Sequence, residues 1–114
     1  MADVSEILTE LKNHLIENYG SSVQDVILFG SRARGDASEY SDFDVLIVLK
    51  RKYSPKDEDR ILDLCYDIDL KYNILIDVHI MSEREKNSIR GRQPVFKNAI
   101  KSGIYAWLLK KKIE

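Results

Sequence analysis

The sequence has one cysteine, two prolines, five glycines and no apolar run near the ~20 residues that a bilayer-spanning helix needs. A lone Cys65 cannot form an internal disulfide. Its place in a helical pattern beside Leu64 predicts a small buried side chain, as is usual in a reducing compartment. The N-terminus lacks the basic segment and apolar run of a secretory signal. We therefore expect a cytoplasmic protein that does not enter membranes.

The net charge of -1 excludes a chain that is basic throughout, although the charges are unevenly placed. Residues 84–112 hold nine Lys or Arg and one acid, whereas residues 55–70 hold six acids and two basic residues. Runs of this kind are typical of solvated helix faces. A length of 114 residues predicts one domain, residues 1–114, with its own core.

Hydrophobic periodicity divides the chain into helices and strands. Helices are predicted over residues 3–18, from Pro55 and from Pro94, and strands over residues 25–29, 42–50 and 73–81. Ser82 and Glu85 have capping-box spacing, which predicts a further helix that Gly91 ends. In the last helix the residues that can form an inner stripe are Val95, Phe96, Ala99 and Ile100. The order predicts an α/β (α+β) fold, a small mixed sheet of three or more strands packed with helices.

The segment GSRARG follows the first predicted strand directly. Gly30 and Ser31 suit a tight turn into a short helix, whose outward N–H groups favour an anion, and Gly35 lets that helix end. Arg32 and Arg34 add positive charge that suits phosphate oxygens. The segment is not a P-loop, because no Gly-Lys-Ser/Thr follows, and taken alone it is also typical of an ordinary turn.

Two aspartates, Asp42 and Asp44, enter the second predicted strand one residue apart. Side chains at i and i+2 of a strand share a face, so these carboxylates project together while Phe43 points the other way. Turn chemistry with Ser41 accounts for Asp42 but poorly for Asp44. A divalent cation accounts for both, and carboxylates suit Mg²⁺ that also binds substrate phosphates.

A third carboxylate, Asp77, lies among apolar residues in the third predicted strand, where a lone charge would be costly. If the second and third strands are neighbours, three carboxylates converge in a two-metal arrangement. Alone, an aspartate in a strand can equally be the partner of an arginine or a backbone turn. His79 lies on the same face, and we interpret it as a packing residue or a support for the site.

The spacing of Gly30-Ser31, ten residues and then Asp42-Phe43-Asp44 resembles the signature of the DNA polymerase β-type nucleotidyltransferase superfamily. Asp77 matches the later carboxylate of that pattern. The ending PVFKNAIKSGIYAW resembles the tail of the short members, the minimal nucleotidyltransferase (MNT) proteins. The resemblance covers nearly the whole chain.

The resemblance implies a polymerase β-like fold that transfers a nucleoside monophosphate from a nucleoside triphosphate to a hydroxyl. It implies that Asp42, Asp44 and Asp77 hold metal ions, two Mg²⁺ in this family, and that Asp77 also assists deprotonation of the hydroxyl. It assigns Gly30 and Ser31 to the phosphates. The phosphate contacts of Arg32 and Arg34 are a separate inference from their charge and position.

Short members that resemble this chain are often antitoxins, paired with a helical HEPN ribonuclease toxin that they adenylylate on a tyrosine. Because the chain has no room for an acceptor-holding domain, we expect the acceptor to be brought by a partner or to lie over an open site, and we favour a partner, with ATP as the donor. One alternative is a non-catalytic module that neutralises its partner by occlusion. Another is a nucleotidyltransferase for RNA or a small molecule, with Phe96, Tyr105 and Trp107 interleaved in the basic segment 84–112. The sequence leaves the donor base, the acceptor, the oligomeric state and the strand order open.

Overall fold

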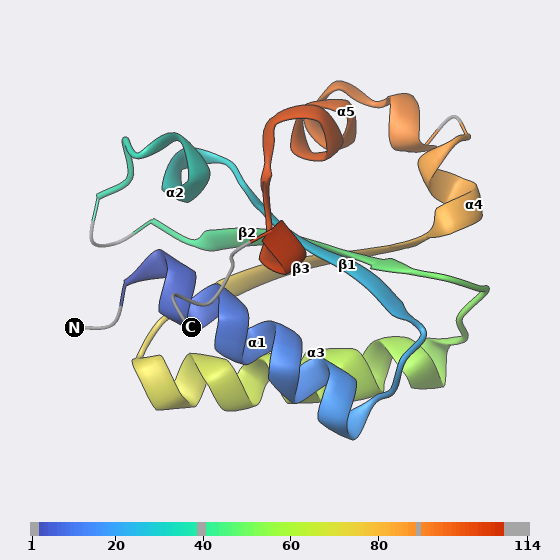
Figure 1. Ribbon diagram of the computed structural model, residues 1–114, viewed down its shortest axis with the longest axis horizontal. Coiled ribbons are helices and arrows are strands. Elements are labelled where there is room, and N and C mark those ends of the chain that lie inside the picture. The colour runs from blue at the N-terminus through green and yellow to red at the C-terminus, as the bar shows by residue number, and fades with distance from the viewer. Residues whose placement is uncertain (1–2, 39–40, 89, 109–114) are drawn as a thin grey trace.

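A four-stranded mixed sheet in the order β3-β2-β1-β4 carries the fold (Figure 1). The computed structural model describes residues 3–38, 41–88 and 90–108. The strands are β1 (Val23–Phe29), β2 (Phe43–Leu49), β3 (Ile76–Ser82) and β4 (Ile104–Tyr105). β2 and β4 are antiparallel to β1, whereas β3 is parallel to β2. The predicted fold class is therefore confirmed.

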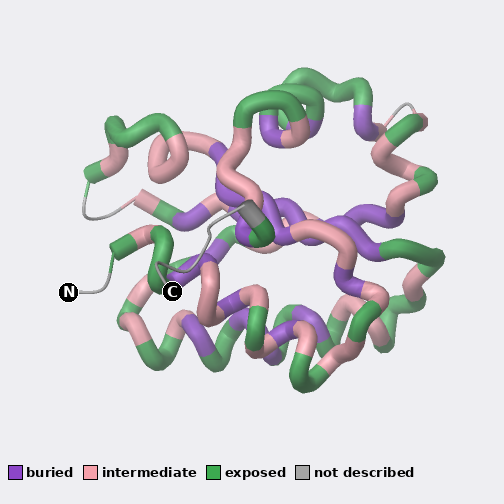
Figure 2. Tube along the Cα trace, viewed as in Figure 1, coloured by how far each residue is buried: buried purple, intermediate pink, exposed green. Residues whose placement is uncertain are grey.

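Helices cover both faces of the sheet (Figure 1). They are α1 (Val4–Asn18), α2 (Ser31–Arg34), α3 (Pro55–Tyr72), α4 (Glu83–Lys86) and α5 (Pro94–Ser102), with 3₁₀ turns at Arg90–Arg92 and Ala106–Leu108. One apolar cluster joins α1 and α3 to one face, and a smaller cluster joins Phe96 and Ala99 of α5 to the other. The buried residues accordingly follow the sheet between the two layers (Figure 2).

The helix ends follow from side-chain caps. Asp3 accepts a hydrogen bond from the N–H of Glu6 at 2.8 Å at the start of α1. Ser54 and Asp57 form a capping box at the start of α3, with Pro55 in the first turn, where its missing N–H costs nothing. The predicted helix starts are therefore confirmed.

All three predicted strands are present, with shifted ends: β1 begins at Val23 rather than at residue 25, and β2 spans Phe43–Leu49 rather than residues 42–50. Val26, Ile27 and Leu28 are almost fully buried, as expected for a strand covered on both faces. β3 begins at Ile76 rather than at residue 73, because Asn73 adopts a left-handed conformation (φ 54°) that caps α3. β4 was not predicted, since a two-residue strand leaves no periodic pattern.

Two details of the C-terminal half correct the prediction. The helix that begins after Ser82 ends at Lys86, well before Gly91. A Cβ on Gly91 would lie 1.9 Å from the carbonyl oxygen of Lys86, so this glycine allows close backbone packing and does not break the helix. In α5, Val95 is 49% exposed and lies outside the buried stripe of Phe96 and Ala99.

Cys65 is buried as predicted, and burial raises the pKa of its thiol to about 12. Within the described part of the chain, no helix has the length and apolar character to cross a membrane.

Candidate active site

The parallel pairing of β2 and β3 brings two predicted carboxylates together. Asp44 lies directly opposite Asp77 in the register, so both side chains project on the face of the sheet that α5 covers. His79 follows two residues after Asp77 on the same face. One ligand atom from each of Asp44, Asp77 and His79 lies within 4.8 Å of the other two.

The electrostatics of this cluster favour a bound cation. Burial raises the pKa of the Asp44 carboxyl, and the nearby charge of Asp77 raises it further, with a smaller contribution from Asp42. His79 opposes this shift. A divalent cation would relieve the repulsion between the carboxylates, and two carboxylates are an oxygen-donor set that suits Mg²⁺. The residues present therefore fit a divalent metal ion.

Gly30 packs directly against the Asp44 carboxylate. Its backbone lies at φ 76° and ψ -157°, a region that is essentially restricted to glycine. A Cβ at this position would lie only 2.2 Å from Oδ2 of Asp44. Gly35, also left-handed, ends α2 and donates its N–H to the carbonyl oxygen of Ser31 at 3.0 Å. The turn predicted from the sequence thus exists and touches the carboxylate cluster.

A cleft of about 880 Å³ opens above this cluster. The turn and α2 form one wall with Gly30, Ser31 and Arg34, and the carboxylate cluster lines the same space. The other wall comes from α5 and the residue after it: Val95, Asn98, Ala99, Ser102 and Gly103. The volume is in the range of small-molecule and cofactor sites, so the cleft can hold a nucleotide.

The α5 wall is the part of the site that sequence reasoning missed. Nothing in the pattern of α5 indicated which helix would lie over the carboxylates. Val95 was expected in the core, and its exposure toward the cleft explains why it departs from the buried stripe.

The two arginines of the turn differ in position. Arg34 lines the cleft and pairs with Asp36 at 3.3 Å. Arg32 instead donates from Nε and Nη2 to the carbonyl oxygen of Ser41, at 3.1 and 2.8 Å, and its guanidinium lies 4.3 Å from the centre of the Phe43 ring. Arg32 therefore connects α2 to Ser41, just before β2, and it does not line the cleft.

The remaining predicted residues lie around the cluster. Asp42 is exposed just before β2 and is outside the three-residue group, although its charge acts on Asp44. The ten-residue spacing between Ser31 and Asp42 includes residues 39 and 40, which lie outside the described residues. Nε2 of His79 is 3.3 Å from Oδ2 of Asp77. The His79 ring contacts the rings of Phe29 and Phe96, at 5.7 and 5.6 Å between centroids, so packing fixes it beside Asp77.

Sequence comparisons agree with this geometry. A family model for the nucleotidyltransferase domain matches residues 8–106. Two proteins of Methanocaldococcus jannaschii are similar to the chain. "Putative protein adenylyltransferase MJ0141" is 38% identical over 75% of this chain and 87% of its own length. "Putative protein adenylyltransferase MJ0604" is 41% identical over 67% and 71%, respectively.

Solved structures share the fold at low identity. A crystal structure of a mutant of the toxin-antitoxin MntA-HpeT superposes with a TM-score of 0.61 at 15% identity, over 88% of this chain and 72% of the other. A toxin-antitoxin with AMP-PNP gives a TM-score of 0.57 at 17% identity, over 87% and 72%. A third structure, "a putative nucleotidyltransferase from Sulfolobus solfataricus", gives a TM-score of 0.54 at 22% identity, over 89% of this chain and 77% of the other. This chain therefore belongs to the nucleotidyltransferase domain family, as its resemblance to the minimal nucleotidyltransferase proteins predicted.

Proposed function

We propose that the chain transfers AMP from ATP to a tyrosine hydroxyl of a partner HEPN toxin and so acts as its antitoxin. The observation that carries the proposal is the pairing of Asp44 with Asp77 directly beneath the Gly30-Ser31 turn, in one cleft. Family membership supports nucleotidyl transfer, and the names of the two relatives support a protein as acceptor. The toxin-antitoxin neighbours, one with AMP-PNP, support the partner class and the nucleotide.

The metal ions of the family would be held by Asp44 and Asp77, with Asp42 at the exposed edge. When bound, two Mg²⁺ ions stabilise the charge on the attacking and leaving oxygens. The donor chemistry and the repulsion around Asp44 support this assignment.

The residues of the chain then position the substrate. The missing side chain at Gly30 lets the triphosphate approach the backbone, and the Ser31 hydroxyl donates a hydrogen bond to a phosphate oxygen. Arg34 on the same wall offers a charged contact to the phosphates.

The transfer is a displacement at the α-phosphorus of ATP. The tyrosine oxygen forms a bond to that phosphorus while the bond to the bridging oxygen of the β-phosphate breaks, so pyrophosphate leaves. Asp77 accepts the proton of the attacking hydroxyl. The exposed position of Asp77, at 53%, supports a bulky acceptor that enters from solvent.

The test is intact-mass spectrometry of the purified chain with ATP, Mg²⁺ and a candidate HEPN toxin, sought among the products of the neighbouring genes. We expect a gain of one AMP, ~329 Da, on the partner. Asp44→Asn and Asp77→Asn should abolish this gain, whereas Glu17→Gln on the exposed surface of α1 should not. An unmodified partner with the wild-type chain would refute the proposal. If the Asp44→Asn chain still protected cells fully, neutralisation by occlusion would replace catalysis.

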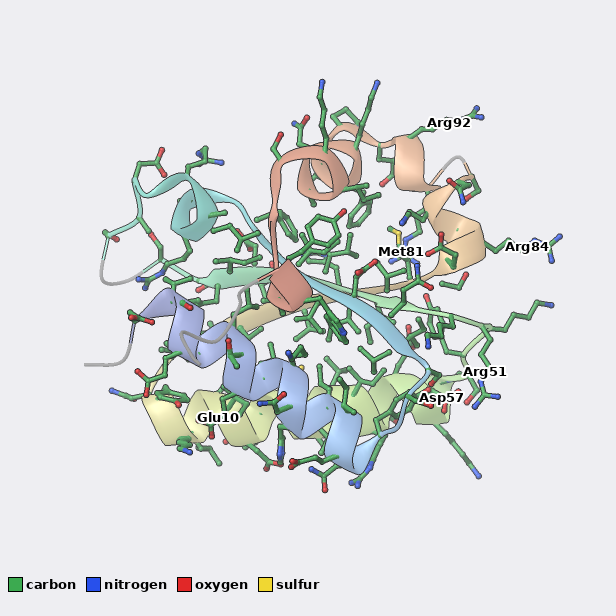
Figure 3. The ribbon with its side chains drawn as sticks, viewed as in Figure 1. Glu10, Arg51, Asp57, Met81, Arg84 and Arg92 are labelled. Carbon is green, nitrogen blue, oxygen red and sulfur yellow. The ribbon has the colours of Figure 1, made fainter. Side chains whose placement is uncertain are left out.

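Acceptance of RNA has less support from the structure. Phe96 is buried, and Tyr105 packs against the same cluster while its hydroxyl donates to the carbonyl oxygen of Ile100 at 2.6 Å, so both residues serve the core of the domain. Arg84 and Arg92 project outward from the molecule (Figure 3). Residues 89 and 109–112 of this basic segment lie outside the described residues. An affinity for tRNA that falls with salt would favour RNA as the acceptor.

A further inference from the structure

The outer face of α3 carries a row of exposed apolar side chains. Leu62, Tyr66 and Leu70 are 45%, 58% and 64% exposed. Their four-residue spacing places them in one row along the helix. The opposite face of α3 already contributes Ile61, Leu64, Cys65 and Ile68 to the core. We call Leu62, Tyr66 and Leu70 the α3 stripe.

The α3 stripe differs from scattered surface residues, which need no explanation. Six large hydrophobic residues are exposed within the described ranges: Leu62, Tyr66, Leu70, Leu75, Val95 and Trp107. Val95 lines the cleft, and Lys12 lies over the ring of Trp107 at 5.3 Å. Of the remaining four, Leu62, Tyr66 and Leu70 form the α3 stripe. Removal of exposed apolar surface from water stabilises a complex, so this row can contribute to binding.

A parallel row of acids borders the α3 stripe. Asp59, Asp63 and Asp67 repeat at the same spacing, and all three are exposed. Asp67 contacts His14 at 2.8 Å. In the part of the chain that the structure describes, Asp59 and Asp63 have no hydrogen-bonded or ion-paired side-chain partner.

The three basic residues of α3 offset this border only in part. Lys71 pairs with Glu10 of α1, which Figure 3 labels, and Arg60 donates to the carbonyl oxygen of Asn18 at 3.3 Å, so both are directed toward α1. Lys56 is exposed one turn before Asp59 and forms no ion pair among the described residues. One lysine against three aspartates leaves the border of the apolar row with a net negative charge.

We propose that the α3 stripe binds an amphipathic helix of a partner protein whose apolar row is flanked by Lys and Arg. The apolar rows would pack together, while the basic flanks pair with Asp59 and Asp63. An anionic lipid surface or a nucleic acid would be repelled by the same acids. Antiparallel pairing of two copies through α3 would bring both acidic rows to the same side, which is unfavourable.

This surface is distinct from the cleft. α1 and α3 cover one face of the sheet, and α5 with the cleft lies on the other (Figure 1). A partner bound to α3 therefore leaves the cleft open, and the inference does not rest on nucleotidyl transfer.

The test is an NMR titration of the ¹⁵N-labelled full chain with a synthetic helical peptide of about 20 residues, long enough to populate a helix. The probe has a Leu row at positions i, i+4 and i+8, with Lys and Arg flanks. Its control has the same row with Glu flanks. We expect shifts that concentrate in α3 with the basic peptide alone.

Charge and apolar contributions are separated with exposed variants. Asp59→Lys/Asp63→Lys should weaken binding about tenfold at low salt, since each reversed contact has the strength of a surface ion pair. Leu62→Gln/Leu70→Gln should abolish binding. Glu6→Lys/Glu17→Lys on α1 makes the same change in net charge away from the stripe and should change affinity less than twofold. All these variants should retain the wild-type circular dichroism spectrum.

Several results would overturn the proposal. One is the absence of chemical-shift changes in α3 at ~1 mM basic peptide, which would exclude even weak binding. The others are equal binding of the acidic peptide and chemical-shift changes that concentrate at the cleft. Sedimentation of the wild-type chain as a dimer that Leu62→Gln/Leu70→Gln dissociates would identify a second copy as the occupant instead.

Discussion

Replacement of Gly30 by alanine tests whether the turn and the carboxylate cluster form one unit. The backbone at φ 76° and ψ -157° costs a non-glycine residue about 1–3 kcal/mol. The new Cβ would also lie 2.2 Å from Oδ2 of Asp44, and such overpacking costs about 1–3 kcal/mol more. We therefore expect Gly30→Ala to lose about 2–6 kcal/mol of unfolding free energy, measured by urea denaturation.

Gly35→Ala is the matched control at the other end of α2. Gly35 also has a positive φ, 83°, but a Cβ there would meet no atom within 4 Å. Its replacement should cost only the left-handed backbone term, about 1–2 kcal/mol. In Gly30→Ala the new Cβ should displace the Asp44 carboxylate, and a displacement of about 1 Å can slow AMP transfer about a hundredfold. Gly35→Ala should have a much smaller effect on the rate.

A double-mutant cycle isolates the contact between Gly30 and Asp44. Asp44→Ala removes the carboxylate and keeps the Asp44 Cβ, which would be 3.4 Å from the new Cβ, an ordinary contact. In that background Gly30→Ala should cost only the backbone term, so the coupling energy should be about 1–3 kcal/mol. A Gly30→Ala cost equal to that of Gly35→Ala, or the absence of coupling, would refute the geometry of the site.

Three further predictions follow from the described contacts. Arg32→Ala should lower the unfolding free energy by about 1–3 kcal/mol, because the hydrogen bonds to the Ser41 carbonyl are lost. Arg34→Ala should instead weaken ATP binding with little change in stability, because Arg34 lines the cleft. Urea denaturation measures the stability and calorimetry the ATP affinity, and the opposite pattern would contradict the positions of the two arginines. The pKa of Asp44 is raised by burial and by Asp77, so its protonated form stabilises the fold below the ordinary carboxyl pKa of about 3.9, and this stabilisation is lost as pH rises through the higher folded-state pKa. Metal-free wild type should therefore lose stability relative to Asp44→Asn as pH rises above about 3.9, and parallel stability curves would contradict this. Burial raises the pKa of the Cys65 thiol to about 12, so a thiol reagent at about pH 8 should react only as the chain opens, and rapid labelling of the native protein would contradict this.

Much of the fold was predictable because its elements carry local signals. The caps at Ser54 and Ser82 and the buried run of β1 each depend on residues close in sequence. Two errors have different causes. Asn73 is the first residue of the predicted strand, yet it adopts a left-handed conformation and caps α3 through a local hydrogen bond from its N–H to the carbonyl oxygen of Asp69. Val95 has an apolar side chain at a plausible core position, yet it faces the cleft.

The chemistry of the site can be predicted from short stretches of sequence. The alternation of side chains in a strand predicts Asp42 and Asp44 on one face, although β2 begins only at Phe43, and a glycine followed by a serine after a buried strand indicates a tight turn. Which side chains meet depends on how the strands and helices pack. The parallel register of β2 and β3 set Asp77 opposite Asp44, the loop directed Arg32 away from the cleft, and α5 closed the second wall. These outcomes depend on contacts between residues far apart in the chain, and local propensities do not encode them.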